Sequence, residues 1–578
     1  MQSSFVLVLW LVLQHGICFG WEQSNPTIGS QAIVDGSLNA CRSLSLDRTI
    51  AVGDRGLILL SSNGGKSWSV QGSRSEDTLL AIHFDDDQVG CIVGGRIEPL
   101  TMRSRGTVLL TSDGGTSWRS VPSALPRLAG IRAFSPKHWI AWGDWSVSLQ
   151  TSLFETVDGG NHWLPVPIPC GHLMSVGILP RVSGTAKEIQ LILVDRLGRC
   201  FSTSDRVHYQ PIQLPESLAS PSKPLVFCDY QSDHWWLGGE GGILYRSVDG
   251  LAWERLYLPG NPRDHELFRL QSLAAIGNQV WIAGTPGNVL WSSSDRGRTW
   301  ETRNIPSKSP IRSVHAFNEQ LLIACGGSGT LLGTRNAGIA WSVHHRAAER
   351  LGALNIASIS EMIGWDILAH VHHEARRTSG ILVLHDQSIE QRSSYRPEQS
   401  QKDRYAAQNL GVAEFLTYDG FPMSGNDGVP RSSDMNSYRA VGSIHAVPES
   451  VLLRRLILEI RMQRPDVVIT DCPTSSGELG TKLSEAVQLA ITWGARKDYR
   501  LFSTESGVGE EAWSVQRTLF RGTKSGGLQF HRSMLLKNTG TILGDVMASL
   551  EGIVQQENHG GYDRASKVSY RTLGTKHS

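Results

Sequence analysis

The stretch Thr111-Ser112-Asp113-Gly114-Gly115-Thr116-Ser117-Trp118 decides the fold, because variants of it recur along the first 345 residues. Most copies combine Ser or Thr, an Asp or Asn, turn glycines and a closing Trp. The related boxes end at Trp68, Trp163, Tyr209, Trp253, Trp300 and Trp341. Their closing aromatics are 41 to 50 residues apart, close to the length of one four-stranded propeller blade. The sequence therefore predicts an all-β propeller of seven blades.

The residue types of the box are typical of a tight hairpin turn. Asp or Asn side chains cap backbone N–H groups, Gly adopts positive φ, and Ser or Thr adds a second local hydrogen bond. We expect the closing Trp to pack its ring between neighbouring blades while its N–H finds a partner. The box residues are therefore interpreted as structural, and none of them is named as functional.

These repeats resemble the Asp-box, or BNR, repeat. A propeller with a box in every blade is most similar to the photosystem II stability/assembly-factor type, which implies a binding scaffold over about residues 30 to 345. The resemblance names no ligand, since a fold does not fix a function. We expect a protein or glycan partner on a propeller face, held by the unrepeated loops.

Charge and composition exclude other partners. The 55 Lys and Arg residues nearly cancel the 54 Asp and Glu residues, so no global field favours nucleic acid. After the first twenty residues, no segment is apolar over the roughly 20 residues that a membrane helix needs. We therefore expect no nucleic-acid partner and no integral membrane segment in the mature chain.

Residues 1–20 predict export. The apolar run Phe5–Leu13 is followed by small residues and by a polar stretch from Glu22, as in a secretory signal peptide. The alternative for this run is a buried strand. We expect a secreted protein, or one of the periplasm or cell envelope, where disulfides can form. Seven cysteines follow the leader, and this odd number leaves at least one thiol free.

Beyond Trp341 the boxes stop, and strands alternate with longer helical stretches. This pattern predicts a Rossmann-like α/β unit with a mainly parallel sheet. The expected domains are a signal peptide at 1–20, the propeller at 21–347 and the α/β domain at 348–578. Strands are expected at 353–357, 381–385, 414–420 and 464–470, with helices at 365–377, at 403–412 and through Leu456 and Ile460.

Three segments of this second part occur in a recognisable order. They are the helix ending in Ala406-Ala407-Gln408-Asn409-Leu410-Gly411-Val412, the strand Phe415-Leu416-Thr417-Tyr418-Asp419-Gly420 and the strand Arg464-Pro465-Asp466-Val467-Val468-Ile469-Thr470. Together they resemble the PIG-L/LmbE-type family of zinc-dependent N-acetylglucosaminyl deacetylases. The resemblance implies a His-Pro-Asp-Asp-Glu motif after the first strand and a later His segment, which together hold zinc.

The positions that correspond to those zinc motifs carry no His. The first motif falls on Ser358-Ile359-Ser360-Glu361-Met362 and the second on Gly477-Glu478-Leu479-Gly480-Thr481. A second alignment places the motif on Ala369-His370-Val371-His372-His373-Glu374, but it leaves six residues before Ile381, too few for the family's first helix. In a helix with about 100° per residue, His370 and His373 lie outside the apolar face of this segment. We interpret this segment as a solvated helix face, with His370, His373 and Glu374 as alternative metal ligands.

The sequence therefore predicts an exported two-domain protein that binds and does not catalyse. Its second domain is expected to be a deacetylase-like pseudoenzyme without catalytic residues or a cofactor. The alternative is an active, atypical metal-dependent N-acetyl sugar deacetylase of the cell envelope, which would use zinc at a rearranged site.

Overall fold

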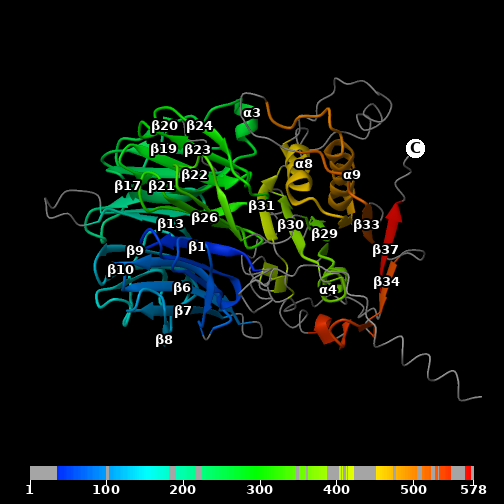
Figure 1. The fold of residues 1–578 in the computed structure, drawn as a ribbon, viewed down its shortest axis with the longest axis horizontal. Helices are drawn as coiled ribbons and strands as arrows, with labels where there is room; N and C mark the ends of the chain where they lie inside the picture. The colour runs from blue at the N-terminus through cyan, green and yellow to red at the C-terminus, as the bar shows by residue number, and fades with distance from the viewer. Residues whose placement is uncertain are drawn as a thin grey trace, which may run out of the picture.

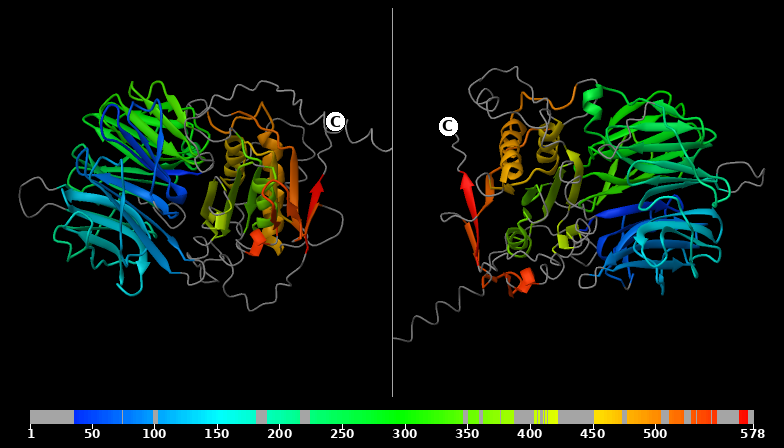
Figure 2. Two further views of the ribbon diagram at one scale, coloured as in Figure 1. Left: turned by 60° about the horizontal axis from the view of Figure 1, so that its bottom comes forward. Right: turned by 180° about the vertical axis from the view of Figure 1, so that it is seen from behind.

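The computed structural model describes residues 36–573 except for some single positions and the segments 99–102, 181–189, 216–223, 346–349, 359–361, 387–402, 422–450, 473–476, 504–510, 523–527 and 549–566. Two units lie side by side in all three ribbon views (Figures 1 and 2). The predicted signal peptide at 1–20 and the predicted boundary between 347 and 348 lie outside the described residues. Within the described residues, no helix is long and apolar enough to cross a membrane.

The first unit is a propeller of seven four-stranded antiparallel sheets, each with its strands in chain order, which confirms the predicted blades. Blades 1 to 3 contain β1 (Leu38–Ser43), β2 (Thr49–Gly53), β3 (Ile58–Ser61), β4 (Ser69–Gln71); β5 (Thr78–Phe84), β6 (Gly90–Ile97), β7 (Ser104–Thr111), β8 (Arg119–Val121); and β9 (Leu128–Ser135), β10 (His138–Ser146), β11 (Thr151–Thr156), β12 (Leu164–Pro165). Blades 4 and 5 contain β13 (Leu173–Ile178), β14 (Leu191–Asp195), β15 (Cys200–Thr203), β16 (Gln210–Pro211); and β17 (Leu225–Gln231), β18 (His234–Gly239), β19 (Leu244–Ser247), β20 (Glu254–Leu256). Blades 6 and 7 contain β21 (Arg269–Ile276), β22 (Gln279–Thr285), β23 (Val289–Ser293), β24 (Glu301–Asn304); and β25 (Ile311–Ala316), β26 (Leu322–Gly326), β27 (Leu331–Thr334), β28 (Ser342–His345).

The box of blade 2 shows why the sequence repeats. Thr111 Oγ1 donates to Asp113 Oδ1 at 2.8 Å, and the same carboxylate oxygen accepts the backbone N–H of Ser117 at 3.0 Å. Although burial opposes it, these hydrogen bonds lower the pKa of Asp113 to about 2. The indole N–H of Trp118 donates to Gly115 O at 3.1 Å, as expected for a buried Trp. The carboxylate is thus fixed as a structural acceptor.

Each closing aromatic connects its blade to the preceding one. Trp118 packs in a buried cluster with Ile50 and Leu60 of blade 1, and Trp253 packs with Val194 of blade 4. The predicted packing of the Trp rings between blades is therefore confirmed for these boxes.

The ring closes between blades 1 and 7 without a shared strand, because every strand of blade 1 comes from the N-terminal end and every strand of blade 7 precedes residue 346. The backbone N–H of Ser43 donates to His315 Nδ1 at 3.2 Å, and Arg312 Nη1 donates to Asn39 Oδ1 at 2.6 Å. Trp68 packs against blade 7 in the same way as the other closing aromatics. Side chains, rather than a β-ladder, hold the two ends together.

The second unit contains a seven-stranded mixed sheet in the order β31-β30-β29-β32-β33-β37-β34. The first five strands in this order are parallel, and β37 pairs antiparallel with β33 and β34. The strands are β29 (Ala353–Ala357), β30 (Ser379–Asp386), β31 (Glu414–Phe421), β32 (Val467–Asp471), β33 (Arg517–Gly522), β34 (Leu528–His531) and β37 (Lys567–Leu573), and a separate hairpin contains β35 (Leu535–Leu536) and β36 (Thr541–Ile542). The helices are α4 (Trp365–His373), α8 (Val451–Gln463) and α9 (Gly477–Gly494). The expected strands and helices are found within a few residues, and the predicted mainly parallel sheet is confirmed for this unit.

Candidate functional site

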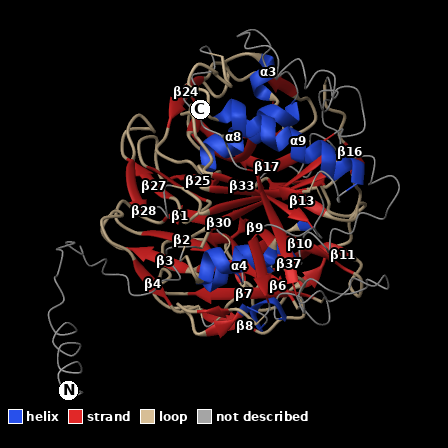
Figure 3. Ribbon diagram, turned by 90° about the vertical axis from the view of Figure 1, so that its right-hand side faces the viewer, coloured by secondary structure: helices blue, strands red, loops and turns tan. Residues whose placement is uncertain are grey.

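The two faces of the propeller differ in what they carry. One face, here called the mouth face, is formed by the connections from the second to the third strand of each blade and from each blade to the next. Short α3 (Pro262–His265) lies on this face between blades 5 and 6. The opposite face, here called the Asp-box face, carries all the boxes. The second unit stands against the mouth face, in front of the ring in Figure 3.

Helix α8 anchors the second unit to α3 through a buried ion pair. Arg454 Nη2 lies 2.8 Å from Asp264 Oδ1, and both side chains are almost completely buried, at 8% and 5% exposure. The other carboxylate oxygen of Asp264 accepts the backbone N–H and the hydroxyl of Ser503 at 2.9 and 2.8 Å. Arg454 also donates to the carbonyl oxygens of Arg263 and Leu501. A buried pair of charges is stable only when its geometry and its further hydrogen bonds are satisfied, as they are here.

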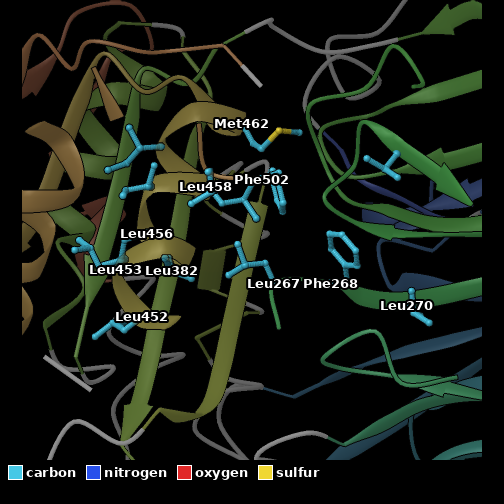
Figure 4. Packing of buried hydrophobic residues seen from close by; sticks show 14 of the residues in the cluster. Leu267, Phe268, Leu270, Leu382, Leu452, Leu453, Leu456, Leu458, Met462 and Phe502 are labelled. Atoms are coloured by element: carbon cyan, nitrogen blue, oxygen red, sulfur yellow. The ribbon is translucent and has the colours of Figure 1, made fainter. Parts of the chain in front are cut away.

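The neighbouring Arg455 makes a second connection to the propeller. Its Nη1 donates to Leu267 O at 2.7 Å, and its Nη2 lies 3.7 Å from Glu240 Oε2. Beside it, the rings of Phe268 and Phe502 stack with centroids 5.9 Å apart. Figure 4 shows these aromatic side chains facing each other across the interface. One hydrophobic cluster runs continuously from blades 5 and 6 through α8 to α9, so the two units share a core.

A third contact lies nearer the centre of the mouth face. Arg404 is helical, as predicted for 403–412, and its guanidinium stands over the ring of Phe415 at 5.4 Å. Burial, followed by the charges of Arg312, Arg127 and nearby groups, lowers the pKa of Arg404 to about 10. The propeller residues whose charges shift the pKa of Arg404 come from blades 1, 3, 6 and 7; they are Asp54, Arg127, Arg269 and Arg312. Arg404 of the second unit therefore lies close to charged groups from four blades.

The second candidate site is the carboxyl edge of the parallel sheet. The chain runs from β29 outward to β31 and then continues on the other side of β29 with β32, so the strand order reverses between β29 and β32. Ligands of open α/β sheets bind at this point. Ser358 follows β29 and Asp471 ends β32, and the Ser358 hydroxyl and backbone N–H both donate to Asp471 Oδ2. Ser358 is one of the residues that the resemblance aligned with the zinc motif.

The environment of Asp471 is unusual for a carboxylate. Its side chain is fully buried, and within the described residues Oδ1 has no hydrogen-bond partner. Burial raises the pKa of Asp471 to about 6, although the hydrogen bonds from Ser358 and the charge of Arg521 oppose the shift. The pair can accept, hold and release one proton near neutral pH.

The alternative metal ligands do not come together with this pair to form a metal site. His370 and His373 lie on α4 and Glu374 caps its C-terminus, where Asn538 donates to Glu374. These residues are partly buried and not fully solvated as expected from the sequence. Burial, the neighbouring His373 and then Arg55 of blade 1 lower the pKa of His372 to about 4.

Across the described part of the chain, no three His, Cys, Asp or Glu side chains gather so as to hold a metal ion. Glu361 and His445 lie outside that part, as do the side chains of residues 477–479. The assignment of His370, His373 and Glu374 as metal ligands therefore stays a prediction.

The polar contacts that join the two units were not predicted from the sequence. The only local signal is that Arg454 and Arg455 interrupt the apolar run Leu452-Leu453-Arg454-Arg455-Leu456-Ile457-Leu458, where a solvent-exposed helix would place charges on one face only. Their partners lie about 190 residues earlier in the chain. Such a distance leaves no trace in a sequence pattern.

Comparisons with known proteins support the propeller. A family model described as photosynthesis system II assembly factor YCF48 matches residues 204–356. The photosystem II assembly lipoprotein Ycf48 of Synechococcus sp. (strain CC9902) is 24% identical over 132 residues, which cover 22% of this chain and 37% of that protein. The chloroplastic photosystem II stability/assembly factor HCF136 of Arabidopsis thaliana is 26% identical over 256 residues, which cover 41% of this chain and 60% of that protein. The alignments thus span less than two thirds of either relative.

Three solved structures are similar to parts of the chain. A structure described as YCF48 bound to D1 peptide covers 52% of this chain and 92% of its own, at 20% identity and a TM-score of 0.41. YCF48 from Cyanidioschyzon merolae covers 52% and 96%, at 17% identity and a TM-score of 0.40. The conserved protein TT1542 from Thermus thermophilus covers 36% and 80%, at 19% identity and a TM-score of 0.25. The family model ends at residue 356, so the resemblance of the second unit to PIG-L/LmbE-type deacetylases stays a prediction.

The raised pKa of Asp471 predicts a pH-dependent stability. Because the folded pKa is about 6 and the ordinary value 3.8, the folded chain binds more protons than the unfolded chain between about pH 4 and 6. Stability therefore falls as the pH rises through that window. Asp471→Asn removes the penalty, so this variant should melt at a higher temperature than the parent chain above pH 6, and at the same temperature near pH 4. Thermal unfolding across this range measures the effect.

The exposed Asp498 supplies the control for this measurement. Asp498→Asn should show no gain in melting temperature above pH 6, because hydrogen bonding and the charge of Arg496 lower the pKa of Asp498. A gain for Asp471→Asn that is equal at pH 4 and pH 7 would contradict the titration.

Proposed function

We propose that this chain is an exported binding scaffold whose propeller binds a protein partner on the Asp-box face. The observation that carries the proposal is that the chain's own second unit packs against the mouth face at blades 5 and 6. Around the opposite face, large apolar side chains are exposed next to the structural box residues. They are Leu46 (53% exposed), Val157 (68%), Val207 (72%), Val248 (71%), Leu251 (63%) and Ile339 (69%).

These apolar side chains lie at positions of the boxes and loops that vary between blades. The Asp, Gly and Trp positions of each box are used by the fold, whereas Val157, Val207 and Val248 belong to three successive blades and contribute nothing to its core. Exposed apolar residues on neighbouring, rigidly spaced elements suit a protein partner. The curated relatives, which are called assembly factors, also favour a protein partner over a glycan.

For the second unit we propose a Rossmann-like, deacetylase-like fold that does not catalyse with zinc. The reversal of strand order between β29 and β32 supports the fold. Catalytic zinc needs three protein ligands and an open position. At the first aligned position, Ser358 instead donates to Asp471 Oδ2. In this proposal the second unit stabilises the propeller by packing on its mouth face, and the Asp-box face stays accessible to a partner.

The binding face is tested by crosslinking from residue 207 of the full chain. A photoreactive amino acid there, in cells that make the protein, should capture a protein that mass spectrometry identifies, and the affinity of that protein is then measured. Val207→Asp with Val248→Asp should weaken binding at least about tenfold, the effect of losing a hot spot of about 1.4 kcal/mol. Leu197→Asp is the matched control, since Leu197 is 54% exposed but lies on the mouth side. Equal weakening by the control, or unchanged binding by the double variant, would contradict the proposal.

The alternative function, a zinc-dependent deacetylase, is favoured by the three histidines of α4 alone. We expect the purified mature chain to contain no stoichiometric zinc and to release no acetate from N-acetylglucosaminides, because the zinc motif positions lack His. Elemental analysis and an acetate assay measure both. Stoichiometric zinc together with turnover that His370→Ala abolishes would establish the alternative.

A further inference from the structure

The junction between the first and last blades contains two thiols. Cys41 lies on β1 of blade 1, and Cys325 lies on β26 of blade 7. Both are buried, at 4% and 0% exposure, in one cluster with Trp68. Among the strands that the structure describes, none from one end of the chain pairs into the blade of the other end, so this junction depends on contacts that involve side chains.

Cys41 lies close to the strand that carries Cys325. Cys41 Sγ lies 3.7 Å from Ser313 O and 3.7 Å from Ile323 O. Ser313 is the direct partner of Cys325 in the β25–β26 ladder, and Ile323 precedes Cys325 by two residues on β26. Cys41 Sγ therefore lies among the backbone atoms that flank Cys325, and after burial Cys41 is the group that contributes most to raising the pKa of Cys325.

Cys91 shows that this arrangement is not general for the buried cysteines. It is buried in blade 2, it donates to Ile92 O, and its hydrophobic cluster contains no second cysteine. None of the seven cysteines from Cys41 onward forms a disulfide in the structure. Cys200 and Cys228 also share one buried cluster, between blades 4 and 5. What distinguishes Cys41 and Cys325 is that they lie where the ring closes.

We propose that Cys41 and Cys325 form a disulfide bond that closes the propeller ring covalently. The bond would join residues 284 positions apart, so it would enclose nearly the whole propeller. A crosslink around so long a loop removes much of the freedom of the unfolded chain and stabilises the folded ring. It would replace the strand pairing that the junction lacks.

The bond forms by two thiol–disulfide exchanges with an external disulfide, either oxidised glutathione or an oxidoreductase of the export compartment. One cysteine thiolate attacks the acceptor disulfide and releases one acceptor thiol. The other cysteine thiolate then attacks the mixed disulfide at the protein sulfur and releases the second acceptor thiol. Two protein thiols are oxidised, one acceptor disulfide is reduced, and the protons end on the acceptor thiols.

Because both thiols are buried in the folded propeller, the exchange must take place during folding. In the closed ring neither thiol reaches an acceptor, and burial raises the pKa of Cys325 well above its ordinary value, which opposes the thiolate. Exchange therefore belongs to folding, before blade 1 settles against blade 7. Once formed, the bond is shielded from reductant until the ring opens.

The first test maps the bond in the full chain. The protein is refolded with oxidised glutathione, blocked with an alkylating agent in denaturant without reductant, and digested with trypsin. The peptide 313–335 contains Cys325 as its single cysteine, and the first tryptic peptide ends at Arg42. Mass spectrometry should find these two peptides joined. Alkylation of both Cys41 and Cys325, or a bond from Cys325 to another cysteine, would overturn the proposal.

The second test compares each chain with itself, oxidised against reduced, so that a destabilised variant still reports. The oxidised parent chain should melt roughly 5 °C above the same chain refolded in reductant, from the size of the closed loop and of the propeller. Cys91→Ala should keep this difference, whereas Cys41→Ala with Cys325→Ala should lose it. A difference that persists in the double variant would overturn the proposal.

Discussion

The buried ion pair between Arg454 and Asp264 is the interaction on which the arrangement of the whole molecule depends. Neither charge could remain in this interior alone, because removing one partner of a buried pair costs about 3 to 5 kcal/mol. Asp264 belongs to a connection of the propeller and Arg454 to a helix of the second unit, so neither unit can bury its charge without the other. The two units are therefore parts of one folded body and not modules on a linker. The covered mouth face and the free Asp-box face both follow from this pairing.

The stability of the propeller depends on a different feature, the Asp-box hairpin with its closing aromatic residue, which is repeated in seven blades. In each well-formed box a carboxylate or amide fixes a turn and a Trp packs on the blade before it, so the stability of a blade depends on its neighbour. Such a ring is complete only when the last blade meets the first. That junction is held by the side chains of Asn39, Arg312 and His315 and by the backbone N–H of Ser43, which makes it the place where a covalent link would matter most.

Local patterns predicted most of the fold. The turn chemistry of the boxes gave the blade count, and alternating apolar runs placed β29 at 353–357, where it is found. What could not be predicted depends on contacts between distant residues. The charges of Arg454 and Arg455 are visible in the sequence, but their partners on blades 5 and 6 are not. The expected solvated face of α4 is partly buried, and Arg55 of the propeller acts on His372, a relation that no helical wheel contains. Asp471 could be named as a candidate ligand from the sequence, but its pairing with Ser358 depends on the fold that brings the ends of β29 and β32 together.

The most direct measurement is a double-mutant cycle on the full chain with Arg454→Ala and Asp264→Ala, followed by denaturant unfolding. The account predicts a coupling free energy above about 1.5 kcal/mol, because both charges are desolvated and share one network. The exposed pair Arg496 and Asp498, at 2.7 Å, is the control and should give a much smaller coupling, because solvent screens both charges. A coupling for the buried pair as small as that of the control would contradict the claim that the second unit is fixed on the mouth of the propeller.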